Sequence, residues 1–138
     1  NCIYLSDEAD VIKKKIMSMF TDPNHVRVED PGKVEGNPVF IYLDAFSRPE
    51  HFAEFLPEYA NLDELKAHYQ RGGLGDVKVK KFLNNVMQAE LAPIRERREE
   101  LLGDMGYIED VLHEGNRRAN EIAEQTLAEV QDAMGMVY

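Results

Sequence analysis

The chain lacks most of the features that would identify an enzyme or a membrane protein from sequence. It has 138 residues and a single cysteine, Cys2, so no disulfide can form within it, which suits the cytoplasm. It has no run of about 18 apolar residues, as a membrane-spanning helix requires. Residues 1–5 have neither the basic lead nor the apolar stretch of a signal peptide. Because the first residue is not methionine, we expect a fragment of a larger protein.

Recognisable catalytic and metal-binding motifs are also missing. The four histidines, His25, His51, His68 and His113, are not spaced as metal ligands, and one cysteine adds little. The glycine-rich stretch 72–75 has no following Lys-Ser/Thr, so it does not match a P-loop. A helix end followed by a new helix start explains those glycines better than a phosphate site does. We therefore predict no catalytic residue and no metal site in this chain.

Charge is distributed unevenly. The net charge is −10 at pH 7, which argues against nucleic-acid binding by the chain as a whole, because phosphate contacts need Lys and Arg. Residues 71–98, however, hold seven basic and three acidic residues, a net of +4, which leaves −14 for the remainder. One basic stretch thus interrupts an acidic protein.

What the sequence does contain is helical periodicity. Apolar residues recur at helical spacing from Ile12 to Phe20, and capping residues precede several such runs. The expected helices begin after Ser6, at Pro38, after Ser47, after Asn61, after Asp76 as the cap, and near Asp104–Tyr107, and residues 21–36 form a polar loop. Pro93 should kink the fifth helix. We predict an all-α fold, a helical bundle that ends in two long antiparallel helices joined by a short loop.

Two basic pairs lie on the first of these long helices. Lys78 and Lys81 are three residues apart, as are Arg95 and Arg98, so each pair shares a helix face. The pairs are separated by about 25 Å on a straight helix at 1.5 Å per residue. This pattern fits a stripe that contacts a nucleic-acid backbone. Ordinary ion pairing with neighbouring glutamates explains it equally well on charge alone.

A resemblance to a known family runs along nearly the whole chain. The ordered motifs are Ile12-Lys13-Lys14-Lys15-Ile16, Thr21-Asp22-Pro23, Glu35-Gly36-Asn37-Pro38-Val39-Phe40, Gly73-Leu74-Gly75-Asp76 and Leu91-Ala92-Pro93-Ile94. In this order they resemble the segment that follows the KMSKS loop of bacterial tryptophanyl-tRNA synthetases, a class I family. The related tyrosyl enzymes fit less well, since the Gly-Asn-Pro-Val-Phe stretch is not expected at this place in them.

The resemblance implies a division of the chain and a function. Residues 1–36 would be the segment after the KMSKS loop, with a connecting helix and loop, and residues 37–138 the helical anticodon-binding region, together forming one compact helical domain. The complete enzyme would attach tryptophan to its tRNA with ATP and magnesium. Catalysis and the main homodimer contacts would lie in a domain outside this chain, which alone should be inactive and without a cofactor.

The resemblance also implies an iron–sulfur cluster in some longer relatives. Its last two cysteine ligands would correspond to Asp76 and Val79 here, and an earlier ligand would fall near Tyr69. Because such a cluster usually needs four thiolates and the chain has one cysteine, we predict no cluster. Helix capping and packing should hold this turn instead.

The hypothesis drawn from these patterns is that residues 71–98 contact the anticodon arm of the tRNA for tryptophan. Basic side chains would hold phosphates, and Tyr69 could stack on an unpaired base, although burial under the glycine turn is equally compatible with its position. The predicted phosphate-binding residues are Arg71, Lys78, Lys81, Arg95 and Arg98. The alternative is a non-catalytic, acidic helical module that binds another protein. Charge favours that alternative, and the motif order favours the synthetase.

Overall fold

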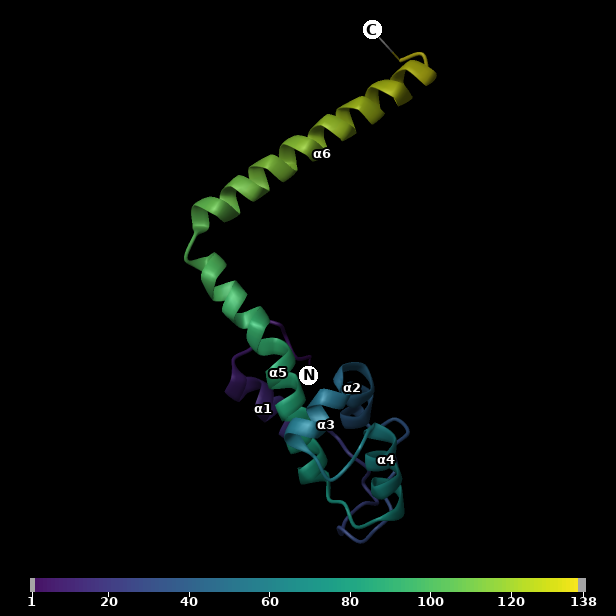
Figure 1. Cartoon of the computed structure of the whole chain (residues 1–138). Coiled ribbons are helices and arrows are strands. Elements are labelled where there is room, and N and C mark those ends of the chain that lie inside the picture. The colour runs from purple at the N-terminus through teal and green to yellow at the C-terminus, as the bar shows by residue number, and fades with distance from the viewer. Residues whose placement is uncertain (1, 137–138) are drawn as a thin grey trace. The chain divides into compact units, whose positions relative to one another are not determined.

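The structure, a computed structural model, describes residues 2–136, in which every regular element is a helix (Figure 1). The helices are α1 (Ala9–Met17), α2 (Pro38–Phe46), α3 (Pro49–Phe55), α4 (Leu62–Arg71), α5 (Asp76–Leu102) and α6 (Met105–Ala133). The predicted all-α class and the two long final helices are confirmed, since α5 has 27 residues and α6 has 29. Their antiparallel packing remains a prediction. No helix among the described residues is both long and apolar enough to cross a membrane.

The chain divides into two compact units, Asn1–Glu96 and Arg97–Tyr138. The division falls within α5, and the functional division at residue 36 that the resemblance implies stays a prediction. Residues 21–36 belong to the first unit because they pack on α4 and on the glycine turn that follows it. For example, the Gly32 amide donates to the Tyr69 carbonyl at 2.9 Å, and the Gly73 amide donates to the Val28 carbonyl at 2.7 Å.

The first unit is built around a core that takes one face from each of α1 to α5. The fully buried side chains include Ile12, Ile16, Val39, Phe40, Leu43, Leu65, Tyr69, Phe82, Leu83 and Val86. Each fully buried aliphatic or aromatic side chain contributes about 1.5–3 kcal/mol relative to an exposed one. In α1 the expected apolar stripe faces inward at Ile12 and Ile16, whereas Phe20, the last residue of that expected stripe, lies after the helix and is 65% exposed.

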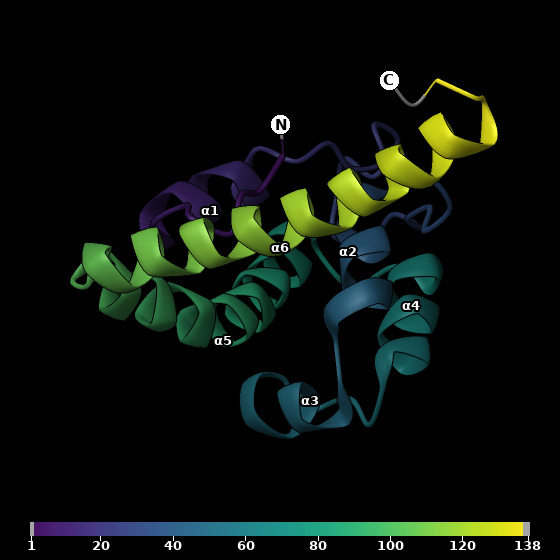
Figure 2. The ribbon, with the colours of Figure 1, turned by 90° about the horizontal axis from the view of Figure 1, so that it is seen from above.

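Helix α1 lies near α5 (Figure 2), and hydrogen bonds at its two ends show that the two helices run in opposite directions. The side-chain amide of Gln88 donates to the carbonyl of Ala9 at 2.9 Å, at the start of α1. At the other end, the Lys80 ammonium donates to the carbonyls of Met17 and Met19 at 3.1 and 2.7 Å. Lys80 is 9% exposed. It satisfies carbonyls that the end of α1 leaves unpaired, so it belongs to the fold and not to a basic surface.

Several helix starts follow their predicted chemistry. The Asn37 side chain accepts a hydrogen bond from the Val39 amide, and Pro38 takes the first position of α2. The Asn61 side chain accepts from the Glu64 amide at the start of α4. In α6 the side chain of Asp104 accepts from the Tyr107 amide. The Asn37 and Asn61 caps confirm the predictions, and Asp104 caps a helix whose start was predicted in this region; all three bonds are local.

Two predicted starts are wrong. Ser6 does not cap α1, which begins at Ala9 after Glu8 with no side-chain capping bond. The Asp7 carboxylate instead accepts from the Tyr4 amide at 2.9 Å and pairs with Lys15. Ser47 ends α2, and α3 follows Arg48, whose amide donates to His51 Nδ1 at 3.2 Å.

In the second unit, α6 is amphipathic and has no buried residue. Its polar face carries a local ion-pair cluster in which Arg117 and Arg118 both bind Glu114, and Arg117 also binds Glu121. Such pairs three and four residues apart stabilise a helix by about 0.2–0.5 kcal/mol each. The small residue Gly115 has open space around it.

Gly32 provides a test of how tightly loop 21–36 packs. A Cβ atom at this position would lie 2.3 Å from Cε1 of the buried Tyr69 ring, which cannot move freely. We expect Gly32→Ala to lower the free energy of unfolding by about 1–3 kcal/mol, as overpacked core sites do. Urea unfolding monitored by circular dichroism measures this.

Gly115→Ala is the matched control. It makes the same substitution in open space within a helix, and should be neutral or stabilising by up to about 1 kcal/mol. Equal stability of Gly32→Ala and the unchanged protein would contradict the packing described here.

Candidate nucleic-acid interface

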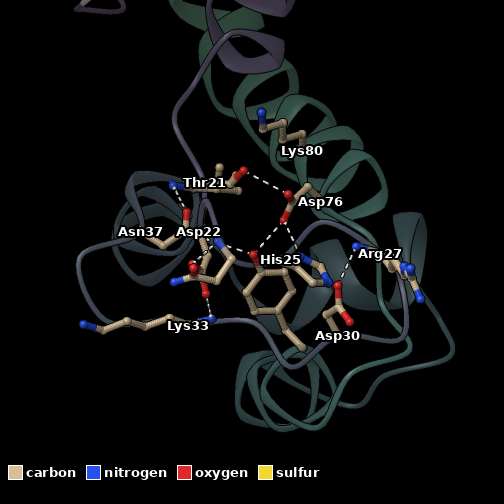
Figure 3. Close-up of polar contacts among 12 residues, drawn as sticks. Thr21, Asp22, His25, Arg27, Asp30, Lys33, Asn37, Asp76 and Lys80 are labelled. Carbon is tan, nitrogen blue, oxygen red and sulfur yellow. Dashed lines mark hydrogen bonds and ion pairs between the residues drawn. The ribbon is translucent and has the colours of Figure 1, made fainter.

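A buried polar network organises the start of α5 (Figure 3). One oxygen of the Asp76 carboxylate, Oδ1, accepts from the Tyr69 hydroxyl at 2.6 Å and lies 3.1 Å from His25 Nδ1. The other oxygen, Oδ2, accepts from the Thr21 hydroxyl at 2.9 Å. Asn37 Nδ2 reaches the Tyr69 hydroxyl at 3.5 Å. The network therefore joins α4, α5, the loop and the start of α2.

The network changes the acid–base properties of its members. Burial alone would raise the pKa of Asp76, but the hydrogen bonds from Tyr69, Thr21 and His25 outweigh it and hold that pKa below its ordinary value. Burial, reinforced by the hydrogen bond to Asp76, raises the pKa of the Tyr69 phenol. Asp76 is thus an anion and Tyr69 a neutral donor at neutral pH.

Two expectations about these residues need correction. Asp76 was expected to cap α5, but its side chain turns inward to Tyr69, Thr21 and His25. Tyr69 was a candidate for base stacking, but its ring is 0% exposed and packs against His25 and Phe40. A nucleotide base cannot reach a ring enclosed on all sides.

The same network occupies the place where the resemblance puts cluster ligands. Tyr69 and Asp76 meet there as a hydrogen-bonded pair, and Val79 is a buried core residue. Within residues 2–136, no three His, Cys, Asp or Glu side chains come together in a way that could hold a metal ion. The turn is held by side-chain hydrogen bonds and core packing.

The structure brings together two of the predicted phosphate-binding residues, Lys78 and Lys81, at a groove of about 600 Å³ beside the first turn of α5. The Lys78 ammonium pairs with Glu58 and lies 5.9 Å from the centroid of the Tyr59 ring. That hydrogen bond to Glu58, together with the charge of Glu58, raises the pKa of Lys78. Lys81 is exposed.

The remaining predicted residues lie elsewhere. Arg71 is exposed in the last turn of α4. Arg95 is half-buried, and its guanidinium turns back along α5 to donate to Gln88 Oε1 at 3.0 Å. Arg98 is exposed and belongs to the second unit. The structure thus places Lys78 and Lys81 at one groove, and a wider stripe that includes Arg95 and Arg98 stays a prediction.

Sequence reasoning missed Arg27, which also lines this groove. Its guanidinium extends away from the Asp76 network (Figure 3). Arg27 lies in the polar loop 21–36, which is held beside α5 by the bond from the Gly73 amide to the Val28 carbonyl and by the contacts of Thr21 and His25 with Asp76. No local pattern in the sequence signals such a long-range contact.

Comparison with known proteins identifies the family. Residues 1–92 match the family described as tRNA synthetases class I (W and Y). The chain belongs to this family. The resemblance inferred from the ordered motifs is thereby confirmed.

Individual relatives of this synthetase family agree with the assignment. The chain is 56% identical to the tryptophan–tRNA ligase of Clostridium longisporum. It is 54% identical to that of Streptococcus pneumoniae serotype 4. Each match covers the whole chain but 38% of the relative, so the chain spans well under half the length of these synthetases.

Solved synthetase structures share the fold. The tryptophanyl-tRNA synthetase of Campylobacter jejuni matches with a TM-score of 0.73 and 26% identity, over 98% of this chain and 40% of that one. Its structure in complex with ADP and tryptophan matches with a TM-score of 0.74, also at 26% identity, over 98% and 39% of the two chains.

The Asp76 network predicts a pH-dependent contribution to stability. Asp76→Asn should lower the free energy of unfolding near pH 7 by about 1–3 kcal/mol, because buried partners lose a charged acceptor. Since the folded pKa of Asp76 lies below its unfolded value, the stability that the carboxylate adds is present above about pH 4 and is lost as pH falls through the folded pKa. Denaturant unfolding at several pH values measures the difference.

The control is Asp110→Asn, which removes the same charge from an exposed position on α6. It should change stability little at any pH. A constant difference between Asp76→Asn and the unchanged protein from about pH 7 to pH 3 would refute the role given to the carboxylate.

Proposed function

We propose that this chain is the C-terminal tRNA-binding region of a tryptophan–tRNA ligase, which attaches tryptophan to its tRNA for protein synthesis. The observation that carries the proposal is the 54–56% identity to tryptophan–tRNA ligases along the whole chain. The family description includes tyrosine enzymes as well. The Gly36-Asn37-Pro38 helix start, in its motif order, supports tryptophan over tyrosine.

The chemistry of the complete protein would take place outside this chain. ATP, with magnesium, would activate tryptophan as an adenylate, and the amino acid would then pass to the tRNA. The complete protein would be a cytoplasmic homodimer whose main contacts lie in the catalytic domain. This chain would contribute recognition of the anticodon arm.

Binding would rest on basic side chains in an otherwise acidic protein. In the first unit the candidates are Arg71, Lys78, Lys81 and Arg95, and in the second unit Arg98 is a separate candidate. Lysine and arginine hold phosphates and make binding depend on salt. Tyr69 is left out because its ring is buried.

The amino-acid specificity is open to a direct test. The complete protein should show ATP–pyrophosphate exchange that depends on tryptophan and not on tyrosine, and should charge the tRNA for tryptophan. This chain alone should do neither. Exchange stimulated by tyrosine, or no exchange with either amino acid, would overturn the proposed activity.

The RNA contacts can be tested in the complete protein by a combined variant, Lys78→Ala, Lys81→Ala, Arg95→Ala and Arg98→Ala. It should bind the tRNA more weakly, and the slope of log K against log salt should fall by about 1 for each phosphate that is no longer bound. Filter binding at several salt concentrations measures both quantities.

A charge-matched variant separates local contacts from overall charge. It removes four basic residues outside the proposed contacts: Lys33, Lys66, Arg117 and Arg118. Equal losses of affinity and of salt slope in the two variants would show that residues 78–98 have no special role.

A further inference from the structure

We propose that the basic groove formed by Arg27, Lys78 and Lys81 holds a backbone phosphate of the bound RNA. This inference rests on the proposed function and adds to it a defined subsite and a residue, Arg27, that no sequence pattern indicated. The three side chains come from two segments, the loop around residues 25–28 and the first turns of α5, which converge on one groove of about 600 Å³.

The two unengaged cations of the groove are Arg27 and Lys81. Neither side chain forms an ion pair with any residue in the described range 2–136. An arginine fork matches the geometry of phosphate oxygens, and a lysine adds a compact point charge. Together the two side chains can donate hydrogen bonds to a phosphate, and no ion-pair partner among residues 2–136 neutralises their charge.

Lys78 is the third cation, and its present partner is replaceable. The side chains of Lys78 and Glu58 are 48% and 50% exposed, and exposed ion pairs of this kind contribute little to stability. A phosphate already bound by Arg27 and Lys81 can therefore compete for the Lys78 ammonium without a large cost to the fold.

The one carboxylate that lines the groove is already engaged. Asp76 directs both oxygens to hydrogen bonds with Tyr69, Thr21 and His25, which places its charge toward the core. The groove also lies at the N-terminal end of the 27-residue α5, where helix amides favour an anion. The three cations outnumber this one carboxylate of the groove lining.

His25 supplies an independent observation. Its side chain is 2% exposed and lines the groove, and its Nε2 atom is buried without a hydrogen-bond partner among residues 2–136. Buried polar atoms are normally paired, so an orphan atom at a groove wall points to a missing ligand. A phosphate oxygen would accept a hydrogen bond from an N–H at Nε2.

The groove also suits the sugar next to the phosphate. Val26, Val28 and Val77 line it and are 82%, 50% and 54% exposed. Apolar surface beside cations fits a nucleotide, whose charged phosphate is joined to a less polar ribose face. We therefore assign the groove to an RNA phosphodiester and not to an acidic peptide.

The test compares Arg27→Ala and Lys81→Ala with Lys33→Ala in the complete protein. Lys33 lies in the same loop as Arg27, is exposed, and does not line the groove, so its variant removes the same charge at a neighbouring place. The Arg27 side chain has no hydrogen bond among residues 2–136. The hydrogen bond from the Arg27 backbone amide to the Asp30 carboxylate is kept in the variant, so the melting temperature should not shift.

Binding is measured with a transcript of the tRNA for tryptophan over a range of salt concentrations. We expect Arg27→Ala and Lys81→Ala each to weaken binding by about tenfold, the size of one charge-assisted hydrogen bond, and each to lower the salt slope by about 1. Lys33→Ala should bind like the unchanged protein.

The outcomes separate this inference from the function on which it rests. If the unchanged protein binds the tRNA but all three variants match it, the groove assignment fails and the proposed function stands. If the unchanged protein does not bind the tRNA, the proposed function fails first. If tRNA binding is unaffected while Arg27→Ala abolishes binding of a poly-glutamate peptide, the groove serves an acidic protein segment, and the RNA assignment is overturned.

Discussion

The hydrogen bond between the Tyr69 hydroxyl and the Asp76 carboxylate is the constraint around which the first unit is arranged. A phenol with a fully buried ring needs a partner, because an unpaired hydroxyl in the core costs about 1–3 kcal/mol. Asp76 provides that partner at 2.6 Å and thereby ties the end of α4 to the start of α5 across the glycine turn. The other carboxylate oxygen, Oδ2, accepts from the Thr21 hydroxyl, and Oδ1, which also accepts from Tyr69, contacts His25 Nδ1. Loop 21–36 is in this way attached to the helices by buried polar contacts, and it is against this ring that Gly32 must pack without a side chain.

Whether the sequence could predict a contact depended on how far apart in the chain its two residues lie. The starts of α2, α4 and α6 were predictable because Asn37, Asn61 and Asp104 bond to amides two or three residues away. Core stripes were predictable for the same local reason. Ser6 and Asp76 look equally good as caps, yet neither acts as one. The Asp76 carboxylate finds three partners outside its own helix, which together outcompete the amides of that helix. Lys80 likewise reads as a surface charge but caps α1 from 61–63 residues away.

The residues of the candidate site differ in the same way, since some follow from local sequence patterns and others do not. Lys78 and Lys81 could be paired by helix geometry, and the structure places both at one groove. Arg27 could not be added, because its position follows from the docking of a loop with no periodic pattern. Tyr69 is a stacking candidate only because it is aromatic, and its spacing from Leu65 indicates a buried position instead. It lies four residues after Leu65 on the same face of α4, and both side chains are fully buried.

The charge of the chain makes its basic groove more informative than the same groove would be on a basic protein. With a net charge of −10, most of the surface repels an RNA backbone, so attraction is restricted to the few places where cations are not neutralised. Repulsion elsewhere would disfavour RNA bound in other registers, so unfavourable contacts would add to the specificity of the proposed interface. The buried network then has a functional consequence. By hydrogen-bonding both oxygens of the groove-lining Asp76 carboxylate and fixing loop 21–36, it directs that charge toward the core and holds Arg27 at the groove. A fold-stabilising hydrogen bond thus also sets the electrostatics of the proposed binding surface.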